Sequence, residues 1–122
     1  MTEVPALKPL VWIGSSRKDV RTLPDPVQDH IGYALYLAQR GSKHRDTKTL
    51  TGFGGASVQE IVTDYDRDTY RAVYTVRFAE RIYVLHVFKK KSKSGIATPK
   101  SDLELIERRL KQAQEIEKNR RT

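Results

Sequence analysis

The sequence has no cysteine among its 122 residues. This absence excludes disulfide-stabilised scaffolds, thiolate zinc sites and cysteine nucleophiles, and it is compatible with a reducing compartment. No apolar run approaches the roughly 18 residues that a membrane-spanning helix needs. The N-terminus, MTEVPALKPLVWIGSS, also lacks the basic start and apolar middle of a signal peptide. We therefore expect a soluble cytoplasmic protein.

Acidic residues are missing from one long stretch of the chain. Residues 81–101 contain six lysines and arginines and no aspartate or glutamate, so this stretch carries +6 of the net charge of +8. Clustered cations are typical of a protein that binds a polyanion, with nucleic acid the leading candidate. A solvated basic loop without a partner is the alternative that charge alone leaves open.

Hydrophobic periodicity predicts two helices after a first strand. Residues 8–14 are apolar and rich in β-branched and aromatic side chains, which favours a strand. A brief helix follows, and Pro24 ends it. A second helix is expected to begin at Asp25, where Gln28 completes a capping box, and to end at Gly41. Residues 41–57 are rich in Gly, Ser and Thr and are typical of a loop.

The second half of the chain predicts an antiparallel meander and a last helix. Residues 58–65, 69–78 and 81–88 have strand character. The last helix is expected to start near Thr98 or Ser101, with Ser101 and Glu104 as a capping box. The predicted fold is one α+β domain of order β-α-α-β-β-β-α over residues 1–122. Two N-terminal helices and a C-terminal helix pack with a curved, mainly antiparallel four-stranded sheet. Residues 7–116 form its ordered core and residues 117–122 a frayed tail.

The periodicity of the second meander strand separates its two faces. Tyr70 lies on an apolar face, whereas Arg71 and Arg77 lie on the opposite one. The next strand leads directly into a lysine run, so Arg71 and these lysines outline a phosphate-binding groove. The alternative is that the two arginines are solvated and pair with Glu60 or Glu80.

Histidines and carboxylates give weaker signals. We expect His30, on a helix, and His86, in a buried strand, to be structural, whereas the role of His44, in a loop, stays open. The carboxylates form no compact ligand set. The acidic residues around 64–68 lack the glycine and distal glutamate of a calcium-binding loop. No metal and no cofactor is predicted.

Several segments in series resemble the phage-derived, HigB-like branch of the RelE/ParE toxin superfamily. The matching pieces are LPDPVQDHIGYALYLAQRG (23–41), KTLTGFG (48–54), VQEIV (58–62), TYRAVYTVRF (69–78), IYVLHVFKKKSKS (82–94) and IATPKSDLELIERRL (96–110). The resemblance implies a RelE-like fold whose open sheet face accepts mRNA in the ribosomal decoding site. It also implies the toxin of a type II toxin–antitoxin pair, silenced by a small helix-turn-helix antitoxin encoded beside it.

The resemblance also implies roles for basic residues. Arg71 falls where the superfamily keeps an arginine that contacts phosphate, and we expect Arg71, Lys89 and Lys90 to be catalytic. RNA-binding residues are expected at Lys48, Arg77, Lys91, Lys93 and Lys100. The sequence departs from the RelE pattern because no tyrosine follows Tyr83. It also lacks the histidine and aspartate-tyrosine-histidine set of one HigB group.

Crowded cations suggest a metal-independent mechanism for cleaving RNA through its own 2′-OH. Neighbouring positive charges lower the pKa of a lysine, so Lys89 or Lys90 could exchange protons while Arg71 binds the scissile phosphate. Replacing Arg71 with alanine is then expected to abolish cleavage and leave the fold intact. Two alternatives stay open. One is a ParE-like gyrase inhibitor, and the other is an inactive nucleic-acid-binding or phage accessory protein on the same fold.

Overall fold

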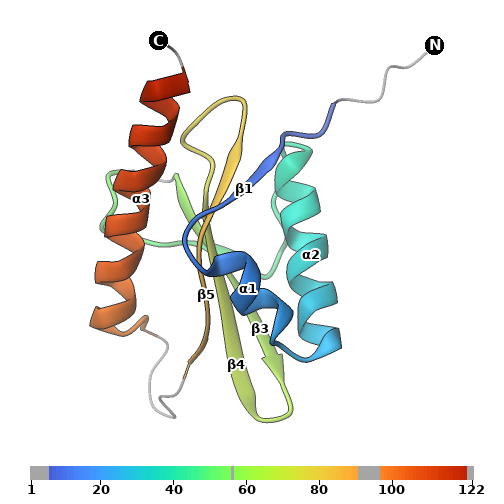
Figure 1. The fold of residues 1–122 in the computed structure, drawn as a ribbon. Coiled ribbons are helices and arrows are strands. Elements are labelled where there is room, and N and C mark those ends of the chain that lie inside the picture. Colours follow the sequence, from blue (N-terminus) through green and yellow to red (C-terminus); the bar gives the residue numbers. More distant parts are fainter. Residues whose placement is uncertain (1–5, 56, 91–96, 121–122) are drawn as a thin grey trace, which may run out of the picture.

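A five-stranded sheet lies between helices on both of its faces (Figure 1). The computed structural model describes residues 6–55, 57–90 and 97–120. The elements, in chain order, are β1 (Leu10–Trp12), α1 (Ser16–Arg21), α2 (Asp25–Gln39), β2 (Thr47–Thr49), β3 (Val58–Tyr65), β4 (Asp68–Thr75), β5 (Ile82–Lys90) and α3 (Lys100–Arg120). The predicted α+β class and the three helices are confirmed.

The sheet differs from the predicted four-stranded one. Its strand order is β1-β5-β4-β3-β2, with β1 parallel to β5 and every other pair antiparallel. The additional strand, β2, lies in the stretch predicted to be a loop. Its sequence, Thr47-Lys48-Thr49, is too short to show an alternating pattern, and pairing with β3 is what makes it a strand. The sheet is therefore mixed and has five strands.

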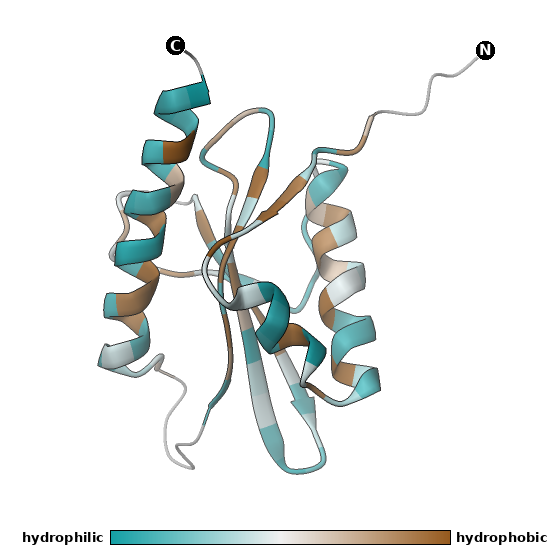
Figure 2. Cartoon of the chain, in the orientation of Figure 1, coloured by the Kyte–Doolittle hydropathy of each residue, from teal (hydrophilic) through white to brown (hydrophobic). Residues whose placement is uncertain are grey.

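Two apolar clusters hold the layers together, one on each face of the sheet. The first lies under α2, where Ile31 and Leu35 pack on Ile61, Tyr74 and other strand residues. The second lies under α3, whose apolar stripe of Leu103, Ile106, Leu110 and Ala113 packs on the opposite face. In Figure 2 the apolar positions of the strands lie between the helices, and the hairpin end of β3 and β4 is hydrophilic.

A β-bulge changes which side chains of β5 share a face. In a strand without a bulge, Ile82, Val84, His86 and Phe88 would share one face. In the structure Tyr74 pairs with Val84 and the neighbouring Val73 pairs with His86, so β5 has one extra residue at this point. Because of the extra residue, each later side chain of β5 lies on the face opposite to the one that strict alternation would give. His86 and Phe88 accordingly lie on the α3 side, whereas Ile82 and Val84 lie on the α2 side.

The helix ends also differ from the predicted ones. Pro24, and not Asp25, is the N-cap of α2, and the Gln28 side chain donates to backbone carbonyl oxygens, including that of Leu23. The predicted capping box is therefore wrong. The same holds for the box at Ser101, because α3 already begins at Lys100.

The C-terminal helix continues beyond the predicted end of the ordered core. Residues 117–120, expected to be part of a frayed tail, belong to α3, and residues 121–122 lie outside the described part of the chain. Glu117 explains this extension. Its carboxylate is buried and accepts hydrogen bonds from the Tyr83 hydroxyl and from Arg120.

Among the helices of the described ranges, none combines the length and apolarity needed to cross a lipid bilayer.

Candidate functional site

A buried ion pair lies where the central strands approach the start of α3. Glu60, on β3, is fully buried, and Arg71, on β4, is 3% exposed. Arg71 Nη1 donates to Glu60 Oε1 at 2.9 Å. Both side chains lie on the α3 face of the sheet. Their strands, β3 and β4, are paired side by side, with Glu60 opposite Val73 and Arg71 opposite Val62. Arg71 therefore pairs with Glu60, as the alternative interpretation held, although the pair is buried and not solvated.

Two further residues complete the surroundings of the Glu60 carboxylate. Lys48, directly opposite Glu60 on β2, places its Nζ 3.7 Å from Oε1. Thr98, just before α3, donates its hydroxyl to Oε2 at 2.7 Å. Lys48 remains 47% exposed, so its ammonium group can reach both the carboxylate and a ligand in solvent. The cluster thus has a buried centre and an accessible rim.

Lys90, the last residue of β5, is the third cation of this cluster. It lies two residues after Phe88, whose cross-strand partner is Arg71, so the two basic side chains share a face. Lys90 is 7% exposed. Burial lowers its pKa below the ordinary value for lysine, and the charges of Arg71 and Lys48 lower it further, against the opposing effect of Glu60. We call Lys48, Glu60, Arg71, Lys90 and Thr98 the basic cluster.

The basic cluster borders a hollow of about 300 Å³. Its lining comes from β2, the residues that follow it, and the residues before and within α3. Lys48, Glu60 and Thr98 are part of this lining. With three cations and one carboxylate, the cluster has a net charge of +2 when all four are ionised. Such a charge favours an anionic ligand over a cation, and a lysine of lowered pKa loses its proton at a lower pH than an ordinary lysine.

Lys89 does not join the cluster. It pairs across the strands with Tyr70, whose side chain belongs to the core under α2. Lys89 Nζ contacts Asp68 at 3.0 Å, and this hydrogen bond raises its pKa. Lys89 and Lys90 therefore lie on opposite faces of the sheet. The structure brings Arg71 together with only one of the two lysines predicted to be catalytic.

The other predicted RNA-binding residues are placed elsewhere. Arg77 donates to the carbonyl oxygen of Phe53 and to Ser57 Oγ, so it organises the loop before β3. Lys100 is exposed at the start of α3 and pairs with Glu104 on the same helix. Lys91 and Lys93 lie outside the described residues. Of the predicted RNA-binding residues that the structure describes, Lys48 alone joins Arg71 and Lys90.

Sequence reasoning identified the cations and missed how they are arranged. The sequence suggested Glu60 only as a partner for a solvated arginine, and Thr98 only as a possible start of the last helix. A charged residue within an otherwise apolar strand, such as VQEIV, signals a buried ion pair, because a lone carboxylate is rarely fully buried. That signal could have identified Glu60. The expected open sheet face is wrong, since α3 packs over the face that bears Arg71.

These features define a small α+β domain with a basic cluster recessed beside its C-terminal helix. The sequence profile of the phage derived protein Gp49-like family (DUF891) matches residues 18–111. Because this match covers most of the chain, the protein belongs to that family. The coarser part of the resemblance, to RelE/HigB-like toxin-related proteins, is thereby confirmed, whereas the HigB-like branch stays a prediction. No curated protein and no solved structure gives a significant match.

Proposed function

We propose that this protein is the toxin of a type II toxin–antitoxin system and that it cleaves mRNA on the ribosome. The single observation that carries the proposal is the basic cluster. Three cations, each from a different strand, lie close together in a domain that belongs to the Gp49-like family. A net positive cluster in a recess suits the phosphate backbone of RNA. No metal or cofactor is needed for the chemistry that we assign to it.

In the proposed reaction the RNA supplies its own nucleophile. The neutral amine of Lys90 takes the proton from a 2′-OH, the hydroxyl oxygen attacks the adjacent phosphorus, and the bond to the 5′-oxygen breaks. The leaving oxygen takes a proton from water or from a protonated lysine of the cluster, and a 2′,3′-cyclic phosphate remains. General base catalysis of this kind contributes about 10²- to 10⁴-fold. Lys48 contacts the phosphate from the exposed rim.

Arg71 has a different role from Lys48 in this proposal. Its Nη1 group is held by Glu60 and Thr98, and the residue is almost fully buried. It therefore supplies positive charge from a fixed position and lowers the pKa of Lys90. A fixed buried charge stabilises the developing phosphorane without having to reorganise.

One observation favours a non-catalytic alternative. Glu60 neutralises part of the positive charge of Arg71, as it would in a fold that kept a structural ion pair and lost its activity. Such a chain would be a nucleic-acid-binding or phage accessory protein, or a ParE-like gyrase inhibitor. It would not need a lysine with a lowered pKa beside the arginine, and for this reason we favour the nuclease.

The test is mRNA cleavage in a reconstituted translation reaction, mapped by primer extension with and without ribosomes. Cuts that depend on ribosomes are expected, together with their suppression by a helix-turn-helix protein encoded next to the gene. Absence of cleavage in both reactions, with inhibition of DNA gyrase in a supercoiling assay, would support the ParE-like alternative. RNA binding without cleavage would indicate an inactive binding protein.

A further inference from the structure

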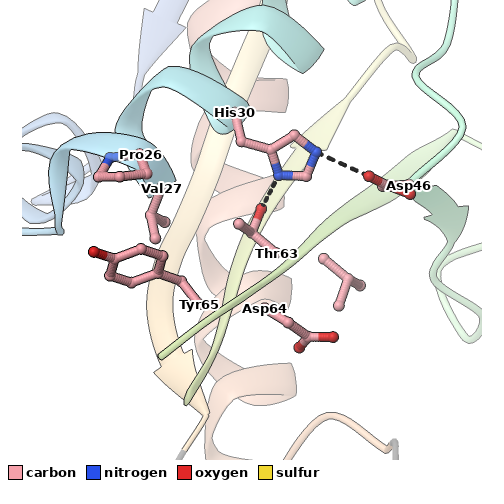
Figure 3. A pocket seen from close by; sticks show the side chains of 8 residues that line it. Pro26, Val27, His30, Asp46, Thr63, Asp64 and Tyr65 are labelled. Carbon is pink, nitrogen blue, oxygen red and sulfur yellow. Dashed lines mark hydrogen bonds and ion pairs between the residues drawn. The ribbon is translucent and has the colours of Figure 1, made fainter. Parts of the chain in front are cut away.

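A second cluster of polar side chains lies on the opposite face of the sheet. His30 from α2, His44 from the connection after α2, and Asp46 immediately before β2 offer ligand atoms that all lie within 4.8 Å of one another. His30 Nε2 is 3.0 Å from Asp46 Oδ2, and His44 Nδ1 is 3.8 Å from the same oxygen. Figure 3 shows His30 pointing toward Asp46 from the helix. We call these three residues the histidine cluster.

The distances suit a small ion with nitrogen and oxygen ligands. Ligand atoms on a tetrahedral Zn²⁺ ion are about 3.3–3.6 Å apart, given bonds of about 2.0–2.2 Å. The observed contacts to Asp46 bracket this spacing. The three ligand atoms lie within 4.8 Å of one another, so binding an ion would draw the two imidazoles closer together. His44 Nδ1 now accepts the backbone N–H of Asp46, and ligation by that atom would replace this hydrogen bond.

The other ring nitrogen of His30 is already oriented. His30 Nδ1 forms a hydrogen bond with Thr63 Oγ1 on β3, shown as a dashed line in Figure 3. A histidine that binds a metal through one nitrogen typically donates the other N–H to an oxygen atom, which fixes the direction of the ring. The backbone carbonyl of Asp46 also accepts the N–H of Val62, which ties the segment to β3. Two of the three ligands are therefore positioned by the fold.

The charge of the pocket beside the histidine cluster favours a cation over RNA. It has a volume of about 400 Å³ and includes the carboxylates of Asp46 and Asp64 in its lining. Among the described residues that line it there is no lysine or arginine. Two histidines near a carboxylate could act as acid and base on RNA, but these acidic walls would repel its phosphates. A positive ion is the ligand that this charge favours.

We propose that His30, His44 and Asp46 bind one Zn²⁺ ion. Imidazole nitrogens select zinc and neighbouring transition metals over magnesium or calcium, which prefer oxygen ligands. The half-exposed Asp46 leaves the site open to solvent, so water completes the coordination. The ion would join α2 to the segment before β2. It would take no part in the reaction proposed at the basic cluster, because Asp46 contacts His30 of α2 whereas Lys48 contacts Glu60 on the α3 side of the sheet.

The test is calorimetric titration of Zn²⁺ into the untagged, full-length, chelator-treated protein. One ion per chain is expected, and Asp46→Asn and His30→Gln should each weaken binding at least tenfold. Thr63→Val should weaken it by about 10- to 100-fold through loss of the orienting hydrogen bond. Asp64→Asn, in the same pocket but outside the cluster, serves as the matched control and should bind as the wild type does.

Two results would overturn the zinc proposal. One is the absence of saturable binding by the wild type. The other is binding that Asp46→Asn leaves unchanged while His86→Gln removes it, which would place the ion at the His86–Asp102 pair. Circular dichroism of each variant separates lost ligation from lost folding. X-ray absorption at the zinc edge gives a second readout, in which two imidazole ligands are expected.

Discussion

The two polar clusters lie on opposite faces of the same sheet edge and differ in the charge that surrounds their carboxylate. Glu60 is fully buried and has three cations around it, whereas Asp46 is half exposed and has two histidines beside it. The first cluster is positive and suits an anion. The second is lined by carboxylates and imidazoles and suits a cation. One strand, β2, contributes Lys48 to the first cluster and follows Asp46 of the second.

This comparison shows that the groups around a carboxylate, more than the carboxylate itself, decide whether a cluster suits an anion or a cation. A buried carboxylate must be compensated by cations within the fold, and the surplus cation charge then becomes available to a ligand. An exposed carboxylate is solvated and needs no such compensation. A variant that changes one cluster therefore leaves the other as an internal control.

The largest expected effect on stability comes from Arg71→Ala. Removing the arginine leaves Glu60 buried without its closest charge partner, which costs about 3–5 kcal/mol of unfolding free energy. The expectation that this variant keeps an intact fold is thereby revised. Urea unfolding measures the loss. The double variant Glu60→Gln with Arg71→Met should recover most of it, and equal instability of the single and double variants would contradict the ion-pair account.

Lys90→Met should stabilise the fold at neutral pH while it impairs cleavage. The pKa of Lys90 is lower in the folded state than in the unfolded state. Above the unfolded-state pKa the lysine is neutral in both states and costs no stability, whereas the cost grows as the pH falls through the folded-state pKa. The fold disfavours the protonated form of Lys90, and methionine removes this cost. The difference in urea midpoint between variant and wild type should narrow as the pH approaches 10.5. A difference that is independent of pH would argue against this origin.

Lys48→Ala should have a moderate effect on RNA affinity. Because Lys48 is the exposed cation of the basic cluster, its loss should reduce the slope of log K against log salt by about one. Fluorescence anisotropy at several salt concentrations measures this slope. Lys100→Ala is the matched control, since Lys100 lies outside the cluster and pairs with Glu104. Equal slopes for the two variants would show that Lys48 is not a phosphate contact.

The smallest effect on RNA cleavage is expected from a change in the histidine cluster. Asp46→Asn should weaken zinc binding at least tenfold and leave RNA cleavage near the wild-type rate, because no residue of the histidine cluster belongs to the basic cluster. Paired assays of zinc binding and cleavage on one protein preparation measure both. A parallel loss of cleavage would show that the two faces are coupled through β2.

The sequence predicted the elements better than their pairing. Periodicity located α2, α3 and the three meander strands, because each buries a regular stripe of side chains. It missed β2, since three residues carry no period, and it could not anticipate the bulge that reverses the faces of β5. The sheet register is set by contacts between distant segments, which local patterns do not contain.

The candidate site was predictable in composition and not in geometry. A run of adjacent lysines alternates between two faces, so sequence alone could not choose between Lys89 and Lys90. The strand register decides this, since Lys90 shares a face with Arg71 and Lys89 shares one with Tyr70. The histidine cluster was likewise hidden, because His30 and Asp46 come from different elements and meet only in the fold.

The cleavage rate of Lys90→Met compared with that of Lys89→Met tests the central claim most directly. Both variants remove one charge from neighbouring residues, so they match in composition and differ only in the face that they alter. On ribosomes programmed with a defined mRNA, Lys90→Met should lower the rate by about 10²- to 10⁴-fold. Lys89→Met should stay near the wild-type rate. Equal rates for the two variants, or a loss confined to Lys89→Met, would contradict the assignment of the basic cluster as the site of RNA cleavage.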